Sequence, residues 1–86
     1  MFYVYLLRSK KDGMLCLGST DDLRKRLSLH NTGHAQSTKS RQPFEIVYYE
    51  AYASEKDARM REHNLKLRRN AFAQLKLRLP NTLRAS

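Results

Sequence analysis

The sequence has 86 residues, which is the size of one small domain and leaves no room for a second. Its 17 Lys and Arg against 8 Asp and Glu give a net charge of +9, which favours a polyanionic partner. Charge alone admits nucleases, ribosomal proteins and binders of anionic membranes. Because the chain lacks an aromatic-rich amphipathic run, we rank nucleic acid above membrane.

Cys16 is the single cysteine, which excludes an intrachain disulfide and a site with several cysteine ligands and favours a reducing compartment. The N-terminal apolar run, FYVYLL, is too short to span a membrane and lacks the order of a secretory signal. We therefore expect a cytoplasmic protein. No pattern indicates an interface between copies, so the oligomeric state stays open, with a monomer as the first expectation.

A β-hairpin is predicted at the N-terminus. Residues 2 to 8 are aromatic and branched, an Asp-Gly pair forms a turn, and residues 14 to 18 are apolar again. If that pair forms the centre of the turn, Ser9 lies opposite Cys16; a longer loop would shift this register. The side chains that then share one face are Tyr5, Leu7, Ser9 and Cys16.

A first helix is predicted next. Residues 19 to 22, STDD, offer capping and acidic side chains for its start, and residues 31 to 33, NTG, form a stop signal. Arg26 and His30 are one helical turn apart, so they lie side by side next to a leucine stripe.

The residues that we expect to contact phosphates directly are basic and lie on this helix and in the polar loop of residues 34 to 43. They are Arg24, Lys25, Lys39 and Arg41.

The second half of the chain predicts a third strand over residues 44 to 52, FEIVYYEAY, followed by two helices. Ser54 caps a helix from Glu55 to about Arg69, and a last helix runs from Ala71 to about Leu79. The predicted fold is α+β: a mainly antiparallel three-stranded sheet flanked by helices, in the order β-β-α-β-α-α. Residues 1–80 form the domain, and residues 81–86 form a short frayed tail.

Several short motifs together resemble the GIY-YIG nuclease superfamily. Residues 3–5, Tyr-Val-Tyr, resemble the first motif and residues 16–18, Cys-Leu-Gly, the second; Arg26, His30 and Glu62 follow in the expected order. The likeness covers residues 1 to about 70, and it is strongest to the branch of small single-domain proteins that begin with a YVYLL-like strand. The order and spacing of these motifs make the resemblance specific, whereas no single motif would be specific by itself.

The resemblance implies a role for each matching residue. Tyr5 corresponds to the tyrosine of the first motif and Gly18 to the glycine of the second. Arg26 corresponds to the active-site arginine, His30 to its neighbour one turn later, and Glu62 to the glutamate that binds a metal ion.

Two positions depart from the family pattern. Tyr3 replaces the glycine of the first motif, and Cys16 replaces the tyrosine of the second. A thiol has neither the reach nor the hydrogen bonding of a phenol. Either Tyr5 or His30 is therefore the general base, or the chain has lost cleavage and kept binding.

The chemistry of these residue types agrees with the implied roles. Phosphodiester hydrolysis needs an activated water, stabilisation of charge on the phosphate, and help for the leaving oxygen. The guanidinium of Arg26 can hold two phosphate oxygens. Glu62 is a hard ligand for one Mg²⁺ or Mn²⁺ ion that otherwise keeps water and phosphate. Tyr5 can accept a proton only if nearby cations lower its pKa from about 10.

Each candidate also has a structural explanation. Tyr5 on an apolar strand can be a core aromatic, and His30 benefits from the helix dipole. Glu62 precedes Lys66 by four residues, which is the spacing of a surface ion pair. Cys16 is better explained as a small buried hydrophobe than as a nucleophile paired with His30.

We therefore predict a metal-dependent endonuclease that acts on DNA rather than RNA. Little sequence specificity is expected, because relatives usually gain specificity from an appended domain. The alternatives are a nucleic-acid-binding protein with a degenerate nuclease fold and a small basic structural or ribosome-associated protein.

Overall fold

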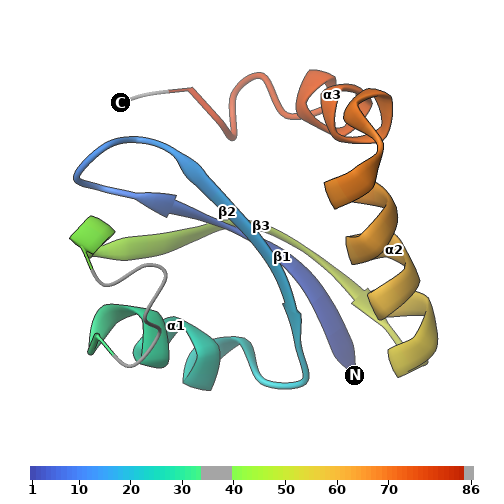
Figure 1. Cartoon of the computed structure of the whole chain (residues 1–86), viewed down its shortest axis with the longest axis horizontal. Helices are drawn as coiled ribbons and strands as arrows, with labels where there is room; N and C mark the ends of the chain where they lie inside the picture. Colours follow the sequence, from blue (N-terminus) through green and yellow to red (C-terminus); the bar gives the residue numbers. More distant parts are fainter. Residues whose placement is uncertain (34–39, 85–86) are drawn as a thin grey trace.

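The computed structural model describes residues 1–33 and 40–84, which form one sheet with three helices (Figure 1). The strands are β1 (Phe2–Ser9), β2 (Leu15–Thr20) and β3 (Phe44–Tyr52), and they lie in the order β2-β1-β3. Both pairs are antiparallel. The predicted α+β class and the predicted sheet are confirmed.

The register of the hairpin differs from the prediction by two residues. Cys16 lies opposite Leu7 instead of Ser9. The loop is longer than a two-residue turn because the Ser9 N–H donates to the Met14 carbonyl (3.0 Å), and β2 begins only at Leu15. Because the shift is an even number of residues, the predicted grouping of side chains on one face is unchanged.

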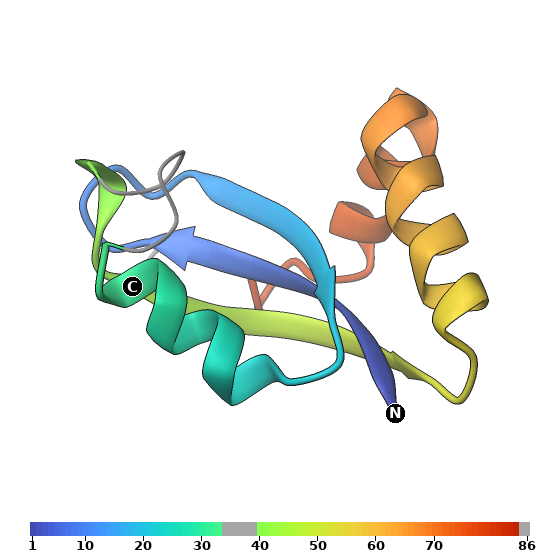
Figure 2. The same ribbon diagram turned by 60° about the horizontal axis from the view of Figure 1, so that its bottom comes forward.

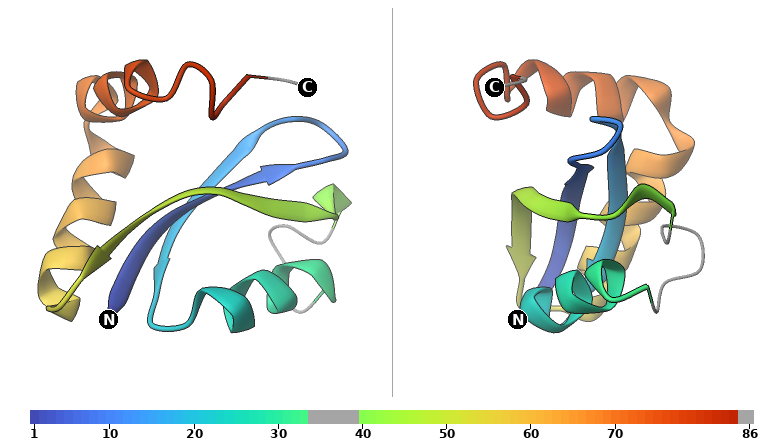
Figure 3. Two further views of the ribbon diagram at one scale, coloured as in Figure 1. Left: turned by 180° about the vertical axis from the view of Figure 1, so that it is seen from behind. Right: turned by 90° about the vertical axis from the view of Figure 1, so that its left-hand side faces the viewer.

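Helices cover the two faces of the sheet (Figure 2). On one face, Tyr5 and Leu7 pack with leucines of α1 (Leu23–Asn31). On the other face, buried side chains of β1 pack with Ala58 and Leu65 of α2 (Glu55–Leu67) and with Leu75 of α3 (Arg69–Leu77). Figure 3 shows α1 and α3 at opposite ends of the molecule with the strands between them.

Helix α1 is held at both ends by side chains that the sequence singled out. The Asp22 carboxylate accepts from the Lys25 N–H (3.0 Å), which caps the first turn. At the other end, the Asn31 amide donates to the Phe44 carbonyl (3.0 Å) and accepts from the Phe44 N–H (2.6 Å). These bonds fasten α1 to the start of β3 and thereby position its polar face.

The chain turns sharply between α2 and α3 at Arg68, close to the predicted break (Figure 1). Beyond α3, the Arg8 guanidinium donates to the Leu83 and Arg84 carbonyls, both at 3.3 Å. These bonds hold the backbone of residues 83 and 84 against β1, and residues 85 and 86 lie outside the described residues. No helix within residues 1–33 and 40–84 has the length and apolar character needed to cross a membrane.

Candidate active site

Tyr5 lies at the centre of β1, directly opposite Gly18 of β2. Its side chain is 4% exposed, and its ring lies against the glycine. A Cβ atom at position 18 would come within 2.6 Å of the Tyr5 Cζ atom, and closer still to the hydroxyl oxygen. The phenol therefore keeps its position only because residue 18 has no side chain.

His30 is buried beneath the same part of the sheet, in the last turn of α1. Its ring centroid lies 6.5 Å from that of Tyr5 and 5.7 Å from that of Phe44, in edge-on geometry. Burial lowers the pKa of His30, and the charge of Arg26 lowers it further. The imidazole is therefore neutral at pH 7, where it can accept a proton.

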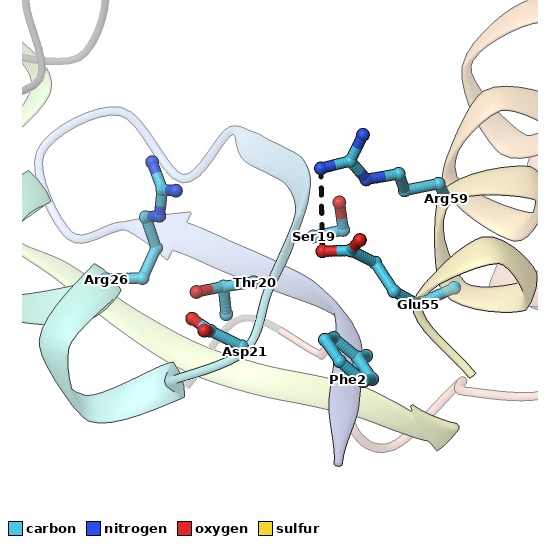
Figure 4. A pocket seen from close by; sticks show the side chains of 8 residues that line it. Phe2, Ser19, Thr20, Asp21, Arg26, Glu55 and Arg59 are labelled. Carbon is cyan, nitrogen blue, oxygen red and sulfur yellow. Dashed lines mark ion pairs between the residues drawn. The ribbon is translucent and has the colours of Figure 1, made fainter. Parts of the chain in front are cut away.

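Arg26 is exposed, one turn before His30 on α1. It lines a first cavity between α1, the end of β2 and the start of α2 (Figure 4). Across this cavity from Arg26 lies Arg59, which forms an exposed ion pair with Glu55 at 3.5 Å. Other polar residues of the lining are Ser19, Thr20 and Asp21.

Glu62 projects from α2 toward the end of β2. Its Oε1 atom accepts from the Ser19 hydroxyl at 2.6 Å, and its Oε2 atom pairs with the Lys66 ammonium at 2.7 Å. The ion pair that the four-residue spacing predicted is thus present. Burial raises the pKa of Glu62, but hydrogen bonds from Lys66 and Ser19 outweigh it and leave this pKa lowered. The carboxylate is ionised at neutral pH.

A second cavity adjoins the first and contains Glu62. The residues that line it are Ser19, Arg59, Glu62, His63 and Lys66. Ser19 and Arg59 line both cavities, so Arg26 and Glu62 face adjoining hollows on either side of the end of β2.

Tyr5, Arg26 and His30 lie on the α1 side of the sheet, whereas Glu62 comes from α2, which packs on the other face. The four candidates do not line one cavity, although the charges of Arg26 and Glu62 both act on the Tyr5 phenol. Burial raises the pKa of Tyr5 to about 12; the charge of Arg26 lowers it in part, whereas Cys16 and Glu62 raise it. The charges of Arg26 and Glu62 therefore act on the pKa of the phenol in opposite directions. The direction of the net shift is opposite to the one that a phenolate base needs.

Glu62 is the carboxylate at which a divalent ion would bind in this cavity, whose other charged lining residues, Arg59, His63 and Lys66, are basic. Within residues 1–33 and 40–84, no group of three or more His, Cys, Asp or Glu side chains is placed to hold a metal. A single ionised carboxylate beside the Ser19 hydroxyl leaves most coordination positions to water and phosphate, as Mg²⁺ prefers. Such an ion would have Glu62 as its protein ligand.

The predicted phosphate contacts differ in their surroundings. Arg24 and Lys25 are exposed on α1. The Arg41 Nε atom donates to Asp12 at 2.9 Å, and the guanidinium lies 5.5 Å from the centroid of the Phe44 ring. The Arg41 side chain is thus fixed to the hairpin turn. Lys39 lies outside the described residues.

Comparison with known families adds to this geometry. Residues 1–76 match the family described as the GIY-YIG catalytic domain. This chain belongs to the GIY-YIG family.

Its relatives are small proteins with the family designation UPF0213. A UPF0213 protein of Bacillus pumilus is 42% identical over 65 residues, which are 74% of this chain and 65% of that protein, slightly under two thirds of its length. A UPF0213 protein of Clostridium perfringens is 42% identical over 77 residues, or 87% of this chain and 82% of that protein. The solution NMR structure of a UPF0213 protein from Bacillus halodurans shares the fold, with a TM-score of 0.52, 34% identity and coverage of 90% and 85%.

Cys16 is the residue that the sequence resemblance assigns to the second-motif tyrosine of the GIY-YIG family. Cys16 is partly buried, and burial raises its pKa, an effect that the charges of Arg41 and Lys66 offset only in part. A raised pKa keeps the thiol protonated at neutral pH, which argues against a nucleophilic Cys16.

Sequence reasoning missed three residues that surround Glu62, namely Ser19, Arg59 and His63. Ser19 was singled out only as a capping residue, and neither Arg59 nor His63 was singled out. The spacing of Arg59, Glu62, His63 and Lys66 along α2 was a usable signal, because residues three and four apart share one side of a helix. No local signal links Ser19 to α2, since 43 residues separate it from Glu62.

Proposed function

We propose that this GIY-YIG protein is an endonuclease that hydrolyses phosphodiester bonds in DNA, with Mg²⁺ or Mn²⁺ and little sequence specificity. One observation carries the proposal: exposed Arg26 and ionised Glu62 face adjoining cavities on either side of Ser19. The net charge of +9 favours a phosphate backbone as the occupant.

In this proposal, Arg26 binds the scissile phosphate. Its planar guanidinium can contact two non-bridging oxygens and remains charged throughout the reaction. Glu62 holds the divalent ion, and a bound ion would stabilise the negative charge that develops on the phosphate. Because Arg26 is exposed and Glu62 only partly buried, both groups are accessible to a DNA strand.

Tyr5 and His30 differ in their ability to accept a proton. With a pKa of about 12, the Tyr5 phenol is protonated at pH 7, so its hydroxyl can act as a hydrogen-bond donor but not as a base. The neutral imidazole of His30 is already in the accepting form. We therefore favour His30 over Tyr5 as the general base and assign the Tyr5 hydroxyl to orienting the water or the phosphate.

The second candidate is a nucleic-acid-binding protein that does not cleave. Cys16 favours it, because a protonated, partly buried thiol replaces the second phenol of the family. The raised pKa of Tyr5 also favours a protein that does not cleave. Of the two motif tyrosines of the family, this chain keeps only Tyr5, whose phenol is far from ionising at neutral pH.

One assay separates these functions. Supercoiled plasmid and single-stranded DNA are incubated with wild type, Glu62→Gln and Asp57→Asn, in Mg²⁺, Mn²⁺ or chelator. Asp57→Asn is the matched control, since Asp57 is an exposed carboxylate on the same helix. We expect metal-dependent nicking by wild type and the control and none by Glu62→Gln. Equal nicking by all three would indicate a contaminant, and salt-sensitive binding without nicking would favour the second candidate.

A further inference from the structure

The Lys66 ammonium holds the outward side of the Glu62 carboxylate. The two groups are 2.7 Å apart, and the Lys66 side chain is 52% exposed whereas that of Glu62 is 21% exposed. The other carboxylate oxygen faces Ser19 of β2. An ion that arrives from solvent therefore meets Lys66 on the carboxylate before it can bind.

An ammonium and a divalent ion repel each other when both contact the Oε2 atom of Glu62. Both are cations, and each takes the same lone pairs of Oε2. The Ser19 hydroxyl is neutral and can stay in place when an ion binds. Lys66 can leave instead, because its charge is carried on a flexible four-carbon chain.

The positions on α2 show where the displaced ammonium can go. Arg59, His63 and Lys66 recur at intervals of four and three residues, which places them along one side of the helix. All three are exposed, and all three line the second cavity. That cavity adjoins the one lined by Arg26 through their shared residues, so basic side chains continue from α1 across to α2 (Figure 4). A phosphate next to the one at Arg26 would meet this strip.

We propose that Lys66 is an internal counter-ion: it occupies Glu62 in the free protein and moves to a nucleic-acid phosphate when a divalent ion binds. This inference rests on the proposed function. It makes Lys66 a residue that couples metal binding to substrate binding. Removal of the Lys66 charge should therefore strengthen metal binding and weaken the binding of nucleic acid when the metal is present. Loss of an ion pair with only a structural role would not produce the second, metal-dependent effect.

The first measurement is Mn²⁺ binding without nucleic acid, followed by the paramagnetic resonance signal of free Mn²⁺. Lys66→Gln should bind Mn²⁺ about two- to fivefold more tightly than wild type, the range expected for loss of a competing exposed ion pair. Lys56→Gln is the matched control, because Lys56 is an exposed lysine on α2 nearly two turns before Glu62. It should bind Mn²⁺ as wild type does, and Lys66→Arg should keep the wild-type affinity.

The second measurement is binding of a fluorescent DNA duplex by anisotropy, with Ca²⁺ or with chelator. In Ca²⁺, Lys66→Gln should bind DNA about threefold more weakly and lose roughly 0.9 from the slope of log affinity against log salt, as for one lost phosphate contact. In chelator, Glu62 holds Lys66, so the difference between Lys66→Gln and wild type should be smaller. Lys56→Gln should not respond to Ca²⁺ differently from wild type.

The outcomes separate this inference from the proposed function. Equal or weaker Mn²⁺ binding by Lys66→Gln, with binding abolished in Glu62→Gln, would overturn the counter-ion role and leave the metal site standing. An equal loss of DNA affinity by Lys66→Gln in Ca²⁺ and in chelator would also overturn the counter-ion role. If wild type and every variant fail to bind Mn²⁺, the metal-dependent nuclease is refuted together with the counter-ion. Circular dichroism of each variant checks that it is folded.

Discussion

Gly18→Ala tests the contact on which the position of the Tyr5 phenol depends. The new Cβ atom would lie 2.6 Å from Tyr5 Cζ and 3.1 Å from Cε2, and the ring is too buried to swing into solvent. Overpacking of a core costs about 1–3 kcal/mol. The reduced freedom of the unfolded chain offsets roughly 0.4–1 kcal/mol of this.

From the middle of each range, about 2 less about 0.7, the net loss of stability for Gly18→Ala is about 1–2 kcal/mol. For a domain of this size, that loss lowers the midpoint of thermal unfolding by roughly 5–15 °C. Cleavage should fall at least about tenfold even at temperatures where the variant is folded, because the phenol must leave its place. Thermal unfolding followed by circular dichroism checks the loss of stability. Nicking is then compared at a temperature about 20 °C lower than the midpoint of each protein, where a cooperative domain is folded.

A double variant identifies the cause. Tyr5→Leu removes the ring atoms that Gly18→Ala would contact. If the contact is responsible, Gly18→Ala should cost at least about 1 kcal/mol less in the Tyr5→Leu background than in wild type. Strictly additive effects, or an unchanged midpoint in Gly18→Ala alone, would refute this reasoning.

Three further predictions concern stability. Glu50→Ala should lower the free energy of unfolding in urea by about 2 kcal/mol, because the Glu50 carboxylate accepts two hydrogen bonds from the Arg61 guanidinium (3.0 and 3.1 Å) and one from each of two tyrosine hydroxyls. A change below about 0.5 kcal/mol would contradict this. Stability should fall as pH rises from about 10 toward 12, because the folded protein favours three protonated phenols that ionise near pH 10 when unfolded. The tyrosines whose pKa burial raises to about 12 are Tyr5, Tyr48 and Tyr52. A urea midpoint that stays constant while phenolate absorbance grows would argue against it. Arg8→Met should cost about 1 kcal/mol and speed hydrogen exchange around Leu83 and Arg84, whose carbonyls Arg8 contacts. Unchanged exchange would show that these residues are held by other contacts.

Local signals in the sequence were enough to predict most of the fold. The strand over residues 44–52 and the start of α2 at Glu55 were predicted as observed, because aromatic and branched runs and helix-forming runs are bounded by nearby breakers. The pair Glu62–Lys66 followed from helical spacing alone. The hairpin register could not be predicted from local signals, because the hydrogen bonds within the turn decide the length of the loop.

Tertiary structure decided the properties of the candidate site. The sequence by itself determined which residue types were present and that Arg26 and His30 lie one turn apart. Only folding brought Ser19 to Glu62 and laid the Tyr5 ring against Gly18. It also decided the direction of the Tyr5 pKa shift. Sequence reasoning could name the nearby cations, but burial is the sum of contacts from segments far apart in the chain, and here it outweighs their charge.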